Sequence, residues 1–265
     1  MQYIIYAIFN EGAAPKNLAE FRQKSPFLEY VGAEGVLAAP TGAGPIKTHL
    51  QYDKAPFSDK AKYIYICRNP YDCCVSFYYH TTRFPVYRFE DGTFEQFLTM
   101  FLAGKVDYGD YFDQLLSWYE HRHKPNILWV TYEGLKSDTR HQVLKIASFL
   151  GEHYATRLLR HPEIMNMILE MTSFESMIGF NDEFRVFTAA DNSDQHILEG
   201  SRQGRSDTTT VLLRKPMTGD FFRKGVPGDW VNHFTADQVR RMKARIAERT
   251  VGSDVMRLWK SMDLP

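Results

Sequence analysis

The sequence predicts an α/β fold in which a central parallel sheet is flanked by helices. Two short runs rich in β-forming residues, 62–67 (KYIYIC) and 126–130 (NILWV), have the length and composition of strands buried on both faces. Helical patterns separate the two runs, so strands and helices alternate along the chain, which favours a parallel arrangement. With 265 residues, the chain has the length of one large domain or two small ones.

The other elements follow from periodicity and from signals at their ends. The apolar opening stretch 2–10 predicts a buried helix or strand, and Thr235-Ala-Asp-Gln238 has the pattern of a capping box that starts a helix running to residue 248. Further helices are predicted at 17–22, 71–81, 93–103, 108–121, 137–150 and 253–261. The Gly/Ala/Pro-rich stretch 32–45 is predicted to be a loop, and the polar stretch 181–219 a long mobile loop.

Composition excludes several classes of function. The 32 basic and 32 acidic residues balance, so there is no general attraction to nucleic acid or to an anionic membrane, and any anion site has to be local. The three cysteines, Cys67, Cys73 and Cys74, fit neither a common zinc spacing nor a disulfide framework. No run of eighteen apolar residues is present, and we expect a cytoplasmic protein.

Three local clusters have residue types that suit chemistry. In FFRKGVPGDW (221–230), Arg223 and Lys224 precede Gly225 and Gly228, and glycine permits backbone angles at which N–H groups face an anion. The competing interpretation of this cluster is a solvated basic turn.

The second cluster, YIYICRNPYDCCVSFYYH, follows the first predicted strand. Ligands of open α/β sheets bind beyond the carboxyl ends of strands, and Arg68 with Ser76 nearby suits a phosphate there. The competing interpretation is a structural ion pair between Arg68 and Asp72, with Ser76 merely tolerated in the helix.

The third cluster is PIKTHL (45–50). In an extended segment Lys47 and His49 point to the same side, where the histidine can remove a proton from a hydroxyl and the lysine can stabilise charge on a leaving oxygen. The competing interpretation is a surface histidine beside a surface lysine.

In their order along the chain, these clusters resemble the cytosolic sulfotransferase family, over nearly the whole sequence. RKGVPGDWVNHFT (223–235) and CRNPYDCCVSFYYH (67–80) are similar to that family's two elements for the 3′-phosphate of 3′-phosphoadenosine 5′-phosphosulfate (PAPS), and KTHL (47–50) to its catalytic segment. YEGL at 132 and TSFESM at 172–177 match two further landmarks, and the C-terminal residues resemble arthropod-type members.

The resemblance implies a single domain, 1–265, with a P-loop-nucleoside-triphosphate-hydrolase-like fold. It also implies metal-free transfer of a sulfuryl group from PAPS to a small acceptor. The acceptor is a phenol, a steroid-like compound or another alcohol, with His49 as general base and Lys47 holding the sulfuryl group. The residues that would hold the 3′-phosphate or surround the adenine are Arg68, Ser76, Tyr132, Thr172, Phe174, Phe222, Arg223, Lys224 and Gly225.

Two departures from the family pattern affect these expectations. The family's 5′-phosphosulfate loop, Pro-Lys-Ser-Gly-Thr-x-Trp, is absent, and residues 2–10 resemble the helix that follows it, so we expect an N-terminally truncated fold without the first strand and that loop. An alternative is therefore a catalytically impaired remnant that binds nucleotide or acceptor. The family's dimer motif is replaced by Val231, Thr235-Ala236 and Arg240, which predicts a monomer or a homodimer built in another way.

Overall fold

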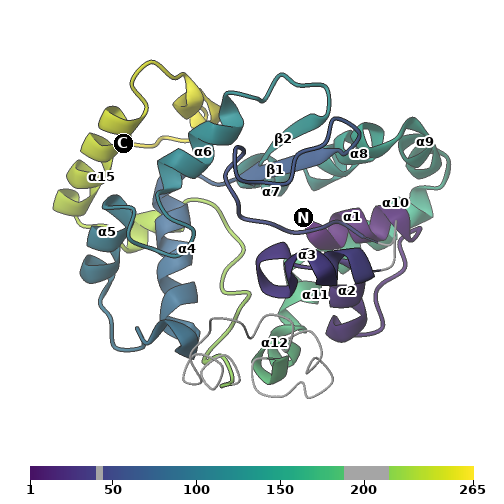
Figure 1. Cartoon of the computed structure of the whole chain (residues 1–265), viewed down its shortest axis with the longest axis horizontal. Coiled ribbons are helices and arrows are strands. Elements are labelled where there is room, and N and C mark those ends of the chain that lie inside the picture. Colours follow the sequence, from purple (N-terminus) through teal and green to yellow (C-terminus); the bar gives the residue numbers. More distant parts are fainter. Residues whose placement is uncertain (40–43, 188–214) are drawn as a thin grey trace. The chain divides into compact units, whose positions relative to one another are not determined.

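The structure, a computed structural model, describes residues 1–39, 44–187 and 215–265 (Figure 1). The chain divides into two compact units. The first unit comprises the described parts of Met1–Thr48, Thr81–Glu90 and Thr139–Gly225. The second comprises His49–His80, Asp91–Asp138 and Val226–Pro265. The expected organisation as a single domain stays a prediction.

The second unit is built on two parallel strands. β1 (Tyr63–Cys67) pairs with β2 (Ile127–Thr131) in register, which confirms both predicted strands and their direction. The expected burial on both faces is wrong for β1, because Ile66 is 37% exposed. Side chains alternate between the faces of a strand, and Tyr65 packs on Trp118 from α6 while Ile66 points the opposite way.

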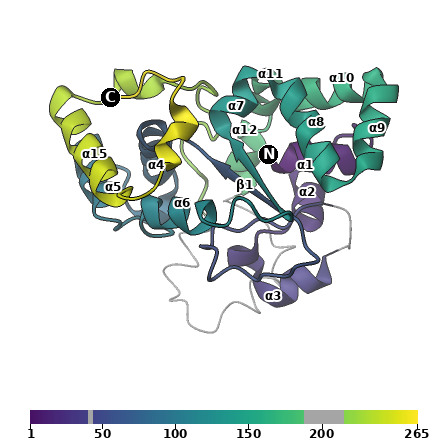
Figure 2. The same cartoon turned by 90° about the horizontal axis from the view of Figure 1, so that it is seen from above.

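The remaining elements of the second unit are helices, several of which begin at recognisable caps. They are α4 (Pro70–Arg83, whose last three residues fall in the first unit), α5 (Phe94–Leu102), α6 (Tyr111–Tyr119), α7 (Tyr132–Ser137), η3 (Asp229–Asn232), α15 (Ala236–Arg249) and η4 (Val255–Trp259). Capping boxes at Thr93 and Thr235 start α5 and α15. These two helices lie side by side in both views (Figures 1 and 2).

The predicted helix 108–121 is shorter in the structure. Tyr108 and Gly109 both have positive φ, at 66° and 81°, which no right-handed helix accommodates. The helix begins only at Tyr111, after the Asp110 side chain accepts hydrogen bonds from Phe112 N and Asp113 N. Residues 108–110 therefore form a turn before α6.

The core of the second unit lies on the face of the sheet that α6 covers. Cys67, Leu115, Tyr119, Val255 and Trp259 form one buried cluster, so the C-terminal segment packs on both the strand end and α6. A second cluster packs Ala55, Trp118 and Ile127 together. The first cluster fixes the carboxyl end of β1, where the candidate site begins.

The first unit is helical in its described part. Its helices are α1 (Gln2–Phe9), α2 (Leu18–Lys24), α3 (Leu28–Ala38), η1 (Pro85–Tyr87), α8 (Thr139–Leu150), α9 (Glu152–Arg160), α10 (Pro162–Met171), α11 (Phe174–Ile178) and α12 (Asn181–Phe187). The apolar opening stretch is a helix: α1 packs against α8 and α10 and buries six of its side chains (Figure 1). In the part of the chain that the structure describes, no helix is long and apolar enough to cross a membrane.

Two predicted loops are partly helical. Residues 32–38 belong to α3, which is kinked at Gly32 (φ 70°) but continues because its Ala, Glu and Leu residues favour helix beyond the kink. Residues 181–187 form α12, whose first turn holds Asp182 and Glu183, as a helix N-terminus favours. The remainder of the predicted loops at 40–43 and 188–214 lies outside the described residues.

Candidate active site

Arg68 stands directly after β1 and is held from several sides. The Tyr111 hydroxyl donates to its carbonyl oxygen at 2.6 Å. Its guanidinium lies 4.5 Å from the centre of the Tyr132 ring, and one terminal nitrogen donates to the Val226 carbonyl at 3.0 Å. The Nε atom of Arg68 is buried and has no hydrogen-bond partner among the described residues. The arginine is thus fixed at the strand end, and its Nε–H donor makes no hydrogen bond to the described residues.

Asp72 joins the start of α4 to the turn at 228–230. Its side chain is fully buried. One carboxylate oxygen accepts from Gly228 N at 2.6 Å and from Asn69 Nδ2 at 2.8 Å, and the other accepts from Trp230 N at 3.0 Å. Arg68 is 3.9 Å away, so the predicted Arg68–Asp72 pair exists but the amide donors are closer. Buried donors of this kind are costly to leave unpaired, which makes Asp72 the anchor of the turn.

Glu133 extends the same buried network. Its Oε1 accepts from the backbone and side-chain nitrogens of Asn69 at 2.8 and 2.7 Å, and its Oε2 accepts from Trp259 Nε1 at 2.8 Å. Asn69 also caps α4, because its Oδ1 accepts from Asp72 N at 2.9 Å. None of the sequence motifs predicted this network. Its one available signal was an Asn immediately before a Pro, which is typical of a helix start.

Gly225, in the first unit, occupies a position that only glycine fits. Its φ is 67°, and a Cβ built there would stand 2.4 Å from a ring carbon of Phe174. Gly228 in the second unit also has positive φ, at 85°. The predicted unusual backbone angles are therefore present at both glycines, and the structure brings Gly225 and Phe174 into contact.

The other predicted cofactor residues of the first unit are placed less uniformly. Phe222 is fixed through its backbone, because its N–H donates to Asn181 Oδ1 at 2.9 Å. The Thr172 hydroxyl donates to Ile168 O at 2.7 Å, so it is already used at the end of α10. Arg223 is half-buried, while Lys224 is exposed.

The predicted site residues are distributed over both units. Lys47, Thr172, Phe174, Phe222, Arg223, Lys224 and Gly225 belong to the first unit, and His49, Arg68, Ser76 and Tyr132 to the second. Within the units, the structure brings Arg68 to Tyr132 and Gly225 to Phe174. Ser76 is exposed on α4. The roles of all these residues stay predictions.

Lys47 is not a free surface lysine. Its backbone N–H donates to Pro26 O and its carbonyl accepts from Leu28 N, each at 2.8 Å. Its ammonium lies 4.5 Å from the centre of the Phe27 ring. Burial lowers the pKa of Lys47 below the usual lysine value, and the negative charge of Glu29 opposes part of this shift. A lysine so placed is anchored, partly desolvated and easier to deprotonate than one in water.

His49 is held by the start of α6 and by the turn before it. Its carbonyl accepts from Gln114 Nε2 at 2.6 Å, and the next carbonyl, of Leu50, accepts from Trp118 Nε1 at 3.0 Å. The imidazole stacks on the Tyr108 ring with 4.1 Å between ring centres and 24° between planes. The competing interpretation of KTH as two surface side chains is thus not supported for either residue.

The three cysteines are free thiols in protein-lined surroundings. Cys67 and Cys74 are buried, and burial raises the pKa of Cys73 to about 12. Among residues 1–39, 44–187 and 215–265, no group of three His, Cys, Asp or Glu side chains is arranged to hold a metal ion.

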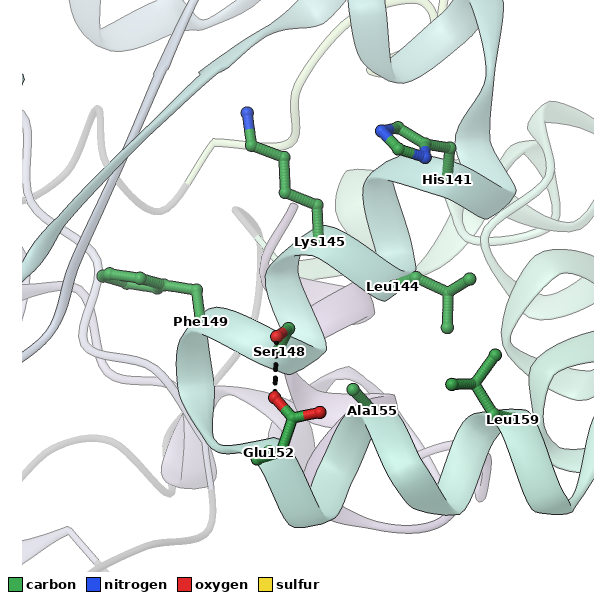
Figure 3. Close-up of a pocket in the computed structure, with 8 residues that line it drawn as sticks. All are labelled: His141, Leu144, Lys145, Ser148, Phe149, Glu152, Ala155 and Leu159. Atoms are coloured by element: carbon green, nitrogen blue, oxygen red, sulfur yellow. Dashed lines mark hydrogen bonds between the residues drawn. The ribbon is translucent and has the colours of Figure 1, made fainter.

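An open groove of about 570 Å³ lies between α8 and α9, and none of the predicted site residues lines it (Figure 3). Leu144 and Leu159 face each other across it, and Ser148 Oγ donates to Glu152 at 3.0 Å. Its lining comprises His141, Leu144, Lys145, Ser148, Phe149, Glu152, Ala155 and Leu159. The residues that line the groove all lie between 141 and 159, a part of the sequence that contains no predicted site residue.

Comparison with known proteins agrees with the site and the fold. Residues 1–208 match the model of the sulfotransferase domain family. The chain is 29% identical to sulfotransferase 1C2 of Homo sapiens, with 96% of this chain and 80% of that protein covered. It is 31% identical to an amine sulfotransferase of Oryctolagus cuniculus, with 99% and 80% covered.

A solved structure gives the same answer. The crystal structure of a mouse sulfotransferase complexed with PAP is similar with a TM-score of 0.56 and 31% sequence identity, and the likeness covers 82% of this chain and 70% of that one. The predicted α/β fold, a parallel sheet flanked by helices, is thereby confirmed. The chain belongs to the sulfotransferase family of enzymes.

Proposed function

We propose that the chain transfers the sulfuryl group of PAPS to a hydroxyl group of a small acceptor, such as a phenol, a steroid-like compound or another alcohol. Membership of the family supports the reaction class, and the mouse relative is complexed with PAP, the nucleotide that remains after such a transfer. The observation that supports the proposal best is Arg68, fixed after β1 with a buried Nε that has no hydrogen-bond partner in the part of the chain that the structure describes.

Arg68 fits an anion for a physical reason. A buried donor without a partner costs free energy, and a phosphate oxygen would supply that partner through a strong charge-assisted hydrogen bond. Gly225 adds a second feature, since its positive φ of 67° gives a turn of the kind in which backbone N–H groups can face an anion. The Phe174 ring beside it offers a surface on which an adenine can stack. Ser76, Tyr132, Thr172, Phe222, Arg223 and Lys224 complete the proposed cofactor set.

In the proposed reaction the acceptor oxygen attacks sulfur in line with the bridging phosphate oxygen. A new S–O bond forms, the bond from sulfur to the bridging oxygen breaks, and the nucleotide leaves as PAP. His49 takes the proton of the acceptor hydroxyl, and the Lys47 ammonium offsets charge on the sulfuryl group and its bridging oxygen. Precise placement of these groups supplies catalysis that needs no covalent intermediate.

The alternative is a protein of the same fold that binds nucleotide or acceptor without turnover. It follows from the sequence, which has no Pro-Lys-Ser-Gly-Thr-x-Trp stretch. One experiment separates the two: the chain is incubated with PAPS and a panel of phenols, steroid-like alcohols and aliphatic alcohols, and sulfated products are sought by mass spectrometry. Product supports the enzyme. No product, together with a melting temperature that PAP raises, supports the binding-only alternative.

The base is tested separately with His49→Ala. Because general-base catalysis typically contributes 10²- to 10⁴-fold, kcat should fall by at least about 10²-fold. The melting temperature should change little, since His49 is only half-buried. Undiminished turnover would remove His49 from the mechanism.

A further inference from the structure

Tyr108 has an unusual combination of properties. It is a large aromatic side chain that is 40% exposed, it lies in the turn before α6, and its ring stacks on His49. Its φ of 66° places it in the left-handed region, where a residue with a Cβ is strained and glycine is favoured. The next residue, Gly109, is already a glycine with φ of 81°. Tyr108 is thus a bulky residue at a position where the backbone conformation favours glycine. Such strain is typical of functional sites.

The geometry of the stack suits a base that has to stay accessible. With 24° between the planes, Tyr108 covers a face of the imidazole. The nitrogen lone pair that accepts a proton lies in the ring plane, so covering a face does not consume it. The ring orientation is therefore restrained while proton transfer at the edge of the ring stays possible.

Helix α6, which follows the Tyr108 turn, also holds the backbone at His49 and Leu50. Gln114 donates to the carbonyl of His49 at 2.6 Å and Trp118 to that of Leu50 at 3.0 Å, both from α6. The turn itself is closed by a hydrogen bond from Gly109 N to Val106 O at 3.0 Å. Backbone and side chain of His49 are thus both positioned by residues 106–118.

We propose that Tyr108 is a positioning residue for His49. It fixes the plane of the imidazole, and the π face of its ring stabilises the imidazolium that forms when His49 takes the acceptor's proton. This inference rests on the proposed function, in which His49 is the general base. Tyr108 then contributes to the sulfuryl-transfer step and not to the binding of PAPS.

The test compares three substitutions at one position. Tyr108→Phe keeps the aromatic face and should retain kcat within about twofold. Tyr108→Leu keeps an apolar side chain but no π face, and kcat should fall roughly tenfold while KM for PAPS is unchanged. Tyr108→Gly suits the left-handed backbone, so it should fold at least as well as the parent chain and still lose kcat like the Leu variant.

A matched control exists in the first unit, where Tyr154 contacts His153 with 3.9 Å between ring centres. The two rings are tilted by 39° and not stacked, but Tyr154→Leu still removes a close Tyr–His ring contact, and it should leave kcat unchanged. Coupling is tested by adding Tyr108→Leu to His49→Ala: if Tyr108 acts through His49, the second substitution lowers kcat no further.

The contact itself has a readout that does not depend on turnover. The Tyr108 ring current should shift the His49 ring protons in NMR spectra, and the Leu variant should lose this shift while the Phe variant keeps it. If His49→Ala retains turnover, the proposed base fails. If His49→Ala lowers turnover but Tyr108→Leu leaves kcat unchanged, the base stands and the present inference is overturned.

Discussion

At the scale of single residues, Lys47 shows how surroundings set chemistry. An isolated Lys-x-His pair in a sequence is commonly two solvated side chains, yet Lys47 is tied to Pro26 and Leu28 through its backbone and lies over Phe27. Burial lowers its pKa, with Glu29 opposing part of the shift. Sequence spacing indicated that Lys47 was a candidate, but only the fold determines that it is anchored and partly desolvated.

This lowered pKa predicts the behaviour of the enzyme at alkaline pH. A lysine whose pKa lies below the usual 10.5 loses its proton, and with it the positive charge proposed to act on the sulfuryl group, at a lower pH than a solvated lysine. We expect kcat/KM to fall on the alkaline side in a pH profile. Lys47→Arg, which stays protonated, should move that fall to higher pH even if its maximal rate is lower.

The control for this profile is Lys54→Arg, because Lys54 is an exposed lysine in the neighbouring turn. Its alkaline limb should coincide with that of the parent chain. An unchanged limb in Lys47→Arg would mean that another group controls the alkaline loss of activity.

At the scale of elements, local signals predicted what local interactions determine. The capping boxes at Thr93 and Thr235 and the β-rich runs that became β1 and β2 needed no information from distant parts of the chain. The turn at Tyr108 could not be predicted in this way, since its left-handed backbone excludes the first residues of the helical pattern 108–121 from the helix. The prediction of a loop at 32–45 was wrong for the part that belongs to α3, because glycines indicate a loop while the helix formers between them favour helix.

The polar network around Asp72 is the part of the site that sequence could not supply. It joins residues 69, 72 and 133 to backbone N–H groups at 228 and 230, more than 90 positions further along the chain. Such a network depends on which loops the fold brings together. Its members are therefore visible only as ordinary polar residues in the sequence.

Asp72→Asn tests whether this network stabilises the start of α4 and the turn at 228–230. Asp72 accepts hydrogen bonds from Gly228 N, Trp230 N and Asn69 Nδ2, and an amide would oppose one oxygen position with its own donor. Leaving buried donors unpaired should lower the free energy of unfolding by about 2–4 kcal/mol, measured by urea denaturation.

The matched substitution is Asp237→Asn in the first turn of α15, where the carboxylate is 55% exposed and, among the described residues, pairs with Arg240 alone. This change should stay within about 0.5 kcal/mol of the parent chain. Equal effects of the two substitutions would show that Asp72 anchors nothing beyond its own helix.

At the scale of the whole molecule, the proposed cofactor residues come from both units. Arg68 and Tyr132 belong to the second unit, and Phe174 and Gly225 to the first. A ligand stabilises whatever binds it by mass action, by about 2.7 kcal/mol at a concentration of 100 times its Kd. Binding of PAP is therefore expected to protect segments of both units from hydrogen exchange, and not only the strand end at Arg68.

Hydrogen exchange followed by mass spectrometry can test this with and without PAP. We expect slower exchange in the peptides that contain residues 66–76 and in those that contain residues 222–228. Adenosine 5′-monophosphate, which lacks the 3′-phosphate, should protect both segments far less. Arg68→Ala should weaken PAP binding by about 10- to 100-fold, because it removes a charge-assisted hydrogen bond to phosphate, and it should bring PAP close to the affinity of the monophosphate. Protection confined to residues 66–76 would remove Arg223, Lys224 and Gly225 from the proposed 3′-phosphate site while leaving Arg68 in it.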